Sequence, residues 1–182
     1  MIRFTPTQIA GVLRVEPQVR ADARGGFARL HCPDEFDWVG GFAPAQTSLS
    51  RNPRKGTLRG MHFQKAPHAE TKLVRVTRGR VFDVALDLRA DSPTHLRWIA
   101  EELSADNLLG LLIPEGVAHG FLTLEPDTDI LYQISPAYRP GFEAGVRWDD
   151  PAFAIIWPFA PSLMSDRDAG YPDYPADPAR LP

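Results

Sequence analysis

Short stretches in which apolar and polar residues alternate run through most of the chain, with turn residues between them. The clearest lies between Gly56 and Arg89, where Val and Leu recur at every second position on both sides of a turn at Arg78-Gly79. A period of two is typical of half-buried β-strands. We therefore expect the segments on either side of this turn to pair as antiparallel strands, with one face on a core and the other facing a cavity or water.

The rest of the chain carries the same signal, because 18 Pro and 14 Gly residues interrupt its apolar runs before any long helical period develops. One short helix is predicted at Pro33 to Trp38, and the tail from Pro158 to Pro182 is predicted to be irregular and to pack over the barrel mouth or fray. Many short strands with regular turns indicate an all-β sandwich or jelly roll around a pocket. Strands are predicted at 11–15, 46–50, 56–64, 72–76, 81–89, 98–103, 108–113, 117–124 and 129–134, and residues 22–30 are predicted to form a turn that leads into a further strand.

Length and composition favour one ordinary globular domain over residues 1–182, large enough to bury a core. A net charge of -3 argues against a general polyanion binder, so no nucleic-acid partner is expected. No run of eighteen apolar residues occurs and the first residues lack a leader pattern, so we expect a cytoplasmic protein with no membrane partner. The single Cys32 excludes an internal disulfide and a cysteine-based zinc site.

Three residues that could take part in catalysis or binding lie close together between Gly56 and Arg89: Arg59, His62 and Lys72. His62 alternates with Met61 and Phe63, so it points away from the core if those two side chains point into it. A cation suited to phosphate, a titratable base and a second cation together suggest a site for an anionic substrate. Taken singly, each has a structural explanation, since most histidines are satisfied structural residues and most cations are solvated.

Other polar residues are more ambiguous when they are taken alone. Tyr132 stands in an apolar strand, where core packing is the usual role, although phenols in barrel cavities also donate protons. The acidic residues around Arg167 in the tail have the composition of a solvated charge cluster. Asp87 and Arg89, at the end of a predicted strand, look structural.

Several blocks of sequence carry a family resemblance: Asp22 to Gly25, Leu58 to Gln64, Lys72 to Val76, Phe82 to Val84, Ser92 to Thr94, Ile113 to Phe121, Tyr132, Trp157-Pro158 and Ser165 to Asp168. In order and over nearly the full length of the chain, they resemble the dTDP-4-dehydrorhamnose 3,5-epimerase family. The resemblance implies a cupin-like jelly roll of the double-stranded β-helix type with short peripheral helices, a homodimer, and no metal or organic cofactor. It further implies an isomerase that epimerises a nucleoside-diphosphate 4-keto-6-deoxy sugar at C3, C5 or both, above all dTDP-4-dehydro-6-deoxyglucose.

The chemistry of such a reaction gives each resembling residue a task. A 4-keto group acidifies the hydrogens on C3 and C5, so inversion needs a base on one face, a proton donor on the other and a cation for the enolate. The resemblance implies that His62 is the base, paired with Asp168, that Lys72 lies beside the C4 oxygen, and that Tyr132 is the general acid. As substrate-binding residues it implies Arg24, Phe27, Arg29, Gln46, Ser48, Arg59, His119, Tyr138, Glu143 and Arg167.

Departures from the family pattern leave the nucleotide open. Family members often carry Glu where this chain has Arg29 and Asn where it has Ser48, and a changed hydrogen-bonding pattern changes which base is accepted. Glu70 stands where Gln is frequent. Enzymes that invert only C3 or only C5 share the fold, so the number of centres inverted is also open.

Two alternatives from other classes stay in view. A non-catalytic nucleotide-sugar binding protein would not need so many reactive side chains. A metal-dependent cupin would use His62, His68, Glu70 and His119 as ligands, a set suited to iron or manganese. Cupin ligands usually include an adjacent His-x-His pair, which this chain lacks.

Overall fold

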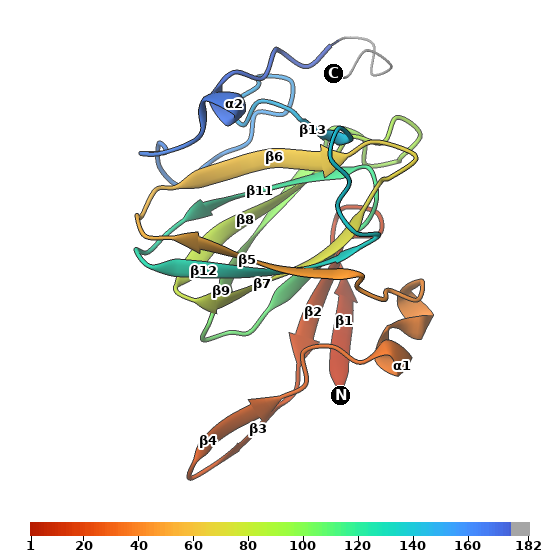
Figure 1. Cartoon of the computed structure of the whole chain (residues 1–182), viewed down its shortest axis with the longest axis vertical. Helices are drawn as coiled ribbons and strands as arrows, with labels where there is room; N and C mark the ends of the chain where they lie inside the picture. The colour runs from red at the N-terminus through yellow and green to blue at the C-terminus, as the bar shows by residue number, and fades with distance from the viewer. Residues whose placement is uncertain (176–182) are drawn as a thin grey trace.

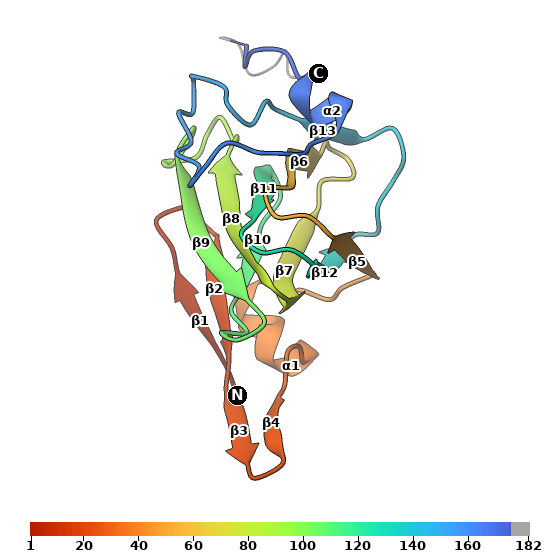
Figure 2. The same cartoon turned by 90° about the vertical axis from the view of Figure 1, so that its left-hand side faces the viewer.

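The computed structural model describes residues 1–175 as two packed antiparallel β-sheets with a hairpin projecting from one end (Figures 1 and 2). The six-stranded sheet contains, in spatial order, β1 (Ile2–Pro6), β2 (Leu13–Pro17), β10 (Gly110–Ile113), β7 (Thr71–Arg78), β12 (Thr128–Ser135) and β5 (Gln46–Asn52). The five-stranded sheet contains β13 (Glu143–Gly145), β6 (Leu58–Gln64), β11 (Val117–Thr123), β8 (Arg80–Asp87) and β9 (Trp98–Ser104). The predicted all-β jelly roll is confirmed.

The main core lies between these two sheets. Val74 and Ile130 of the six-stranded sheet pack in one cluster with Ala85 and Phe121 of the five-stranded sheet, and all four are essentially inaccessible to solvent. Burying a side chain of this size stabilises the fold by roughly 1.5–3 kcal/mol. The alternation of the strands thus supplies one apolar face to the core.

The turn at Gly79 does not join two paired strands, so that prediction was wrong. β7 pairs with β10 and β12, whereas β8 pairs with β9 and β11 in the other sheet. The chain therefore arches from one sheet to the other at Gly79, whose φ is 74° and where a Cβ atom would lie 2.4 Å from Oγ1 of Thr128. Alternation identifies a strand but does not specify its partner, and both strands are mostly buried.

Most of the other predicted elements are confirmed with small changes of boundary. Residues 22–30 belong to a hairpin of β3 (Val19–Asp22) and β4 (Gly25–Ala28), and the predicted helix is α1 (Pro33–Phe36) followed by a 3-10 turn at Asp37–Val39. The prediction missed β1, β3, β13 and the four-residue helix α2 (Asp166–Ala169) in the tail. None of the helices in residues 1–175 is long and apolar enough to cross a membrane.

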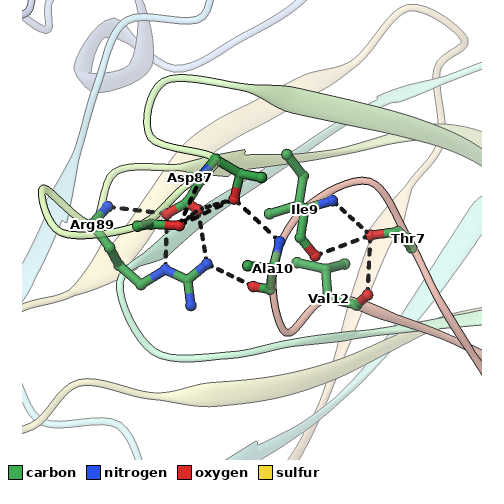
Figure 3. A network of polar contacts seen from close by, with 8 residues as sticks. Thr7, Ile9, Ala10, Val12, Asp87 and Arg89 are labelled. Atoms are coloured by element: carbon green, nitrogen blue, oxygen red, sulfur yellow. Dashed lines mark hydrogen bonds and ion pairs between the residues drawn. The ribbon is translucent and has the colours of Figure 1, made fainter.

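A polar network fastens the N-terminal strands to the end of β8 (Figure 3). Arg89 donates hydrogen bonds of 2.8 Å to each oxygen of Asp87 and one of 2.6 Å to the carbonyl of Ala10. Thr94 donates to Asp87 at 2.6 Å and accepts from the Ala10 N–H at 3.1 Å. Burial alone would raise the pKa of Asp87, but hydrogen bonds from Arg89, Ser92 and Thr94 outweigh it and lower the pKa to about 2. The structural role predicted for Asp87 and Arg89 is confirmed.

Candidate active site

A pocket of about 320 Å³ lies between β6 and the adjacent strands β5 and β12 of the other sheet. Ten of the residues that the sequence suggested for catalysis or binding line it, and Asp168 lies directly behind one of them. The lining residues are Gln46, Ser48, Ser50, Arg59, His62, Phe63, Gln64, Glu70, Lys72, His119, Tyr132, Ile134, Tyr138, Glu143 and Arg167.

An irregularity in strand pairing brings Arg59 and His62 to the same pocket. Three positions apart on a regular strand, they would point to opposite faces of the sheet. The register between β6 and β11 shifts after the pair His62–His119, opposite Gly60, and this change of register allows both side chains to reach the pocket. Gly60 has a φ of 144°, and a Cβ atom there would lie 2.5 Å from the Cα atom of Gly120.

His62 is hydrogen-bonded to a carboxylate that the tail delivers. Its Nε2 atom lies 2.7 Å from Oδ1 of Asp168, whose other oxygen accepts from the Gly60 N–H at 3.2 Å. Burial alone would raise the pKa of Asp168, but the hydrogen bonds from His62, Gly60 and Ser165 lower it. Because an ionised carboxylate only accepts hydrogen bonds, Nε2 is the donor in this contact, and Nδ1 is the ring nitrogen left to accept a proton from a ligand. The His62 side chain is 40% exposed, so this base is accessible from the pocket.

Tyr132 faces the pocket from the opposite sheet. Burial raises the pKa of its phenol well above the ordinary value, and the nearby Asp83 carboxylate adds to this effect. The hydroxyl therefore stays protonated at neutral pH and is available as a proton donor. Since His62 is on β6 and Tyr132 on β12, a ligand between the two sheets has a base on one side and an acid on the other.

Lys72 places a cation in the same pocket. Its Nζ atom lies 2.6 Å from Oε1 of Glu70, and the lysine is only 5% exposed. The second oxygen of Glu70 accepts a hydrogen bond of 2.9 Å from the Gln64 amide. A charge that is this deeply buried acts more strongly on a nearby oxygen than the same charge in water.

The remaining pocket residues form a polar rim. Arg59 donates to Oδ1 of Asn52 at 2.9 Å, and Gln46 donates to Ser48 at 2.9 Å while accepting from the Tyr138 N–H at 3.0 Å. Two further lining residues are tied to local partners, Glu143 to the Gly141 N–H at 2.6 Å and Arg167 to Tyr171 at 2.9 Å.

Tyr171 and Gln64 lie at this site although neither was predicted as a functional residue. The ring of Tyr171 lies 6.4 Å from that of His62, and Gln64 lines the pocket and binds Glu70. Gln64 carried a signal that could have found it, since it lies two positions after His62 and shares its strand face. Tyr171 lies in the irregular tail, where no periodicity indicated a contact.

Three predicted substrate-binding residues lie outside this pocket, on or next to the projecting hairpin. Arg24 is ion-paired with Asp22 at 2.6 Å, Phe27 is 74% exposed, and Arg29 is paired with Glu35 at 2.9 Å. The hairpin is at one extremity of the molecule and α2, which carries Asp168, is at the other (Figure 1). The structure therefore does not bring them to the pocket of their own chain.

The four residues considered as metal ligands each have another partner. His62 is bonded to Asp168 and Glu70 to Lys72, while the ring of His68 packs 4.4 Å from that of Phe142. His119 is bonded to Asp83 at 2.8 Å. Within residues 1–175, no three or more His, Cys, Asp or Glu side chains are arranged to hold a metal ion.

Comparisons with known proteins identify the family of this chain. The family model described as dTDP-4-dehydrorhamnose 3,5-epimerase matches residues 6–175. The chain belongs to this family. The dTDP-4-dehydrorhamnose 3,5-epimerase of Salmonella typhimurium is 42% identical to it over 94% of this chain and 95% of the relative.

Structural similarity extends over the same length. A crystal structure of the Bacillus anthracis dTDP-4-dehydrorhamnose 3,5-epimerase, with TDP and PPi bound, superimposes with a TM-score of 0.91 at 38% identity, covering 95% of this chain and 99% of that one. The family also includes a dTDP-4-dehydrorhamnose 3-epimerase of Streptomyces niveus, 38% identical over 92% of this chain and 81% of the relative. Overall identity therefore does not separate one inverted centre from two.

Proposed function

We propose that this protein is an isomerase that converts dTDP-4-dehydro-6-deoxyglucose to dTDP-4-dehydrorhamnose by inverting C3 and C5. The observation that carries the proposal is the placement of His62, with its carboxylate partner, opposite the protonated phenol of Tyr132 across one pocket. Membership of the 3,5-epimerase family supports the same reaction.

Each inversion follows from the groups present. His62 removes the proton from C3 or C5, and the C–H electron pair moves into the C4 carbonyl to give an enolate. The Lys72 ammonium stabilises the oxygen on which this charge develops, in the manner of an oxyanion hole. Tyr132 then donates its proton to the same carbon from the opposite face, and the proton gained by His62 and the one lost by Tyr132 are exchanged with solvent. No redox partner is needed, because the substrate's own ketone accepts the electrons.

The polar rim is suited to the nucleotide end of the substrate. Arg59 presents a guanidinium at the pocket mouth, and such a planar fork suits phosphate oxygens. Gln46, Ser48, Tyr138 and Glu143 supply hydrogen-bonding groups beside it, and Arg167 adds a second cation. His119, which packs against the Tyr132 ring, forms part of the pocket wall and lies nearer the sugar end. No cofactor takes part in this scheme.

We further propose a homodimer, in which the β3–β4 hairpin of one copy reaches the pocket of the other with Arg24, Phe27 and Arg29. An apolar ring that is 74% exposed at the end of a projecting hairpin favours contact with a second molecule. Within residues 1–175, the hairpin has no neighbour among the pocket residues of its own chain. The whole chain of 182 residues would act as one domain, and the absence of a membrane-spanning helix among residues 1–175 is compatible with the cytoplasmic location that we propose.

Mixed dimers test this arrangement. If both residues act in the reaction, Arg24→Ala and His62→Asn should each inactivate the homodimer. A mixture of the two variants should regain activity if Arg24 acts on the pocket of the partner. One site per mixed dimer would then contain both native residues. A monomeric mass by light scattering, or a mixture without recovery, would contradict the proposed dimeric site.

The reaction is tested by proton NMR of dTDP-4-keto-6-deoxyglucose in deuterated water. Loss of both the H3 and H5 signals is expected. Loss of H3 alone would favour the second candidate, a C3-only epimerase such as the name of the Streptomyces niveus relative describes. No exchange by the folded protein, with this or another nucleotide's keto sugar, would favour a binding protein. Exchange only with another nucleotide would instead point to the effect of Arg29 and Ser48 on base recognition.

A further inference from the structure

Glu70 is a buried carboxylate inside the pocket that the reaction scheme leaves without a task. It is 9% exposed and lies just before β7, two residues ahead of Lys72. Both of its oxygens are engaged, one by Lys72 at 2.6 Å and the other by the Gln64 amide at 2.9 Å. A buried charge at this position is costly unless it is fully paired, and here it is.

The surrounding donors explain why a carboxylate occupies the position. Lys72 offers only N–H groups, and the Gln64 amide turns its NH2 toward Glu70 because its own oxygen accepts from the Arg139 N–H at 2.9 Å. A group that faces donors on both sides must accept on both sides. An amide in place of Glu70 would set its NH2 against that of Gln64, or force Gln64 to turn away from Arg139.

We infer that Glu70 is a positioning residue, which holds the Lys72 ammonium at one point in the pocket so that its remaining N–H groups face the substrate oxygen. A lysine side chain has four rotatable bonds, and an unpaired ammonium would sample several positions. The catalytic consequence of this inference rests on the proposed function. The ion pair between Glu70 and Lys72 does not depend on that function.

Two variants separate the charge from the hydrogen-bond network. Glu70→Gln removes the charge and creates the donor–donor conflict with Gln64. The double variant Gln64→Glu/Glu70→Gln restores every hydrogen bond, because residue 64 then accepts from both Arg139 and the new amide, but it leaves Lys72 facing a neutral oxygen. Glu102→Gln, which removes a surface carboxylate paired with Arg80 at 2.7 Å, is the matched control.

The kinetic readout is exchange and turnover of dTDP-4-keto-6-deoxyglucose. In Glu70→Gln we expect kcat to fall at least about tenfold with KM changed less than about threefold, because Lys72 acts mainly on the charge that develops in the transition state. In the double variant we expect the melting temperature to recover while kcat stays low. The control should match the wild type in both measurements.

A second readout does not need activity. The chain has only three lysines, and Lys55 is exposed and Lys65 half-buried, so the ammonium signal of Lys72 can be assigned in 15N-lysine NMR spectra. A slowly exchanging Lys72 signal is expected in the wild type and in Glu102→Gln, and its loss in Glu70→Gln and in the double variant.

The outcomes distinguish the inference from the proposed function. If the wild type exchanges no proton but the Lys72 signal behaves as described, the proposed function fails and the positioning of Lys72 by Glu70 stands. If the double variant regains kcat together with stability, Glu70 has only a structural role and the inference is overturned. An unchanged Lys72 signal in Glu70→Gln would also overturn it.

Discussion

The pocket contains two histidine–carboxylate pairs that differ in what surrounds them. His62 and His119 are direct cross-strand neighbours on β6 and β11, and each has Nε2 within 2.8 Å of an aspartate oxygen. The side chain of His62 is 40% exposed and its aspartate comes from the tail, whereas the side chain of His119 is 4% exposed and Asp83 comes from the adjacent strand β8.

The difference shows that the same pair of residue types can serve chemistry or rigidity. His62 meets the pocket with a free ring nitrogen, so it can exchange protons with a ligand. His119 is enclosed by the sheet and packs edge-on against the Tyr132 ring, with centroids 5.8 Å apart. We therefore propose that the His62 pair transfers protons in the reaction proposed above and that the His119 pair supports Tyr132.

The largest expected effect separates the pairs by activity. His62→Asn should slow deuterium exchange at C3 and C5 by about a thousandfold or more, because general-base catalysis contributes on this scale. The midpoint of thermal unfolding should fall only slightly, since His62 is partly exposed and Asp168 keeps its backbone donor from Gly60 after the pairing with His62 is lost. NMR exchange and calorimetry measure the two effects, and wild-type exchange in this variant would remove His62 from the mechanism.

Tyr132→Phe should have the next largest effect and tests the far side of the pocket. Removing the hydroxyl is expected to slow epimerisation by about a hundredfold, as for other general acids, while part of the proton abstraction by His62 survives. Product formation should thus fall more than deuterium exchange when both are followed in one NMR experiment. Equal losses, or none, would show that another group reprotonates the sugar.

His119→Asn should act mainly on stability. Asp83 is fully buried, and among residues 1–175 its second oxygen has no hydrogen-bond partner, so the loss of His119 leaves a poorly satisfied carboxylate. We expect a loss of about 2 kcal/mol in the free energy of unfolding, measured by urea denaturation. An unchanged unfolding midpoint would mean that the His119–Asp83 pair does not stabilise the fold.

The sequence predicted much of this site because its polar residues stand in strands with clear alternation. His62 beside the buried Met61 is an example, and the strands over 46–50 and 129–134 were placed within a few residues. Resemblance, rather than periodicity, selected Asp168, since nothing local indicates that a four-residue helix in an irregular tail reaches β6.

Other features depend on contacts that no local pattern encodes. Strict alternation would place Arg59 on the opposite face of the strand from His62, and the register shift opposite Gly60 is what allows both to reach the pocket. The same limit produced the false hairpin at Gly79, because strand pairing is decided between segments far apart in the chain. Phe27 was grouped with the pocket although it belongs to the β3–β4 hairpin, which projects from the opposite end of the molecule to α2 (Figure 2).

The smallest expected effect is the pH dependence of the His62 pair. The pKa of Asp168 is lowered in the folded protein, so the pairing stabilises the fold above the ordinary aspartate pKa of about 3.9 and this contribution is lost as the pH falls through the lower, folded value. Asp168→Asn lacks the titrating group. The difference in unfolding free energy between wild type and variant should therefore shrink as the pH falls below about 4. Asp87 titrates in both proteins, so its contribution to the unfolding free energy cancels in this difference. A difference that stays constant down to acid pH would show that the pairing of Asp168 with His62 does not stabilise the fold.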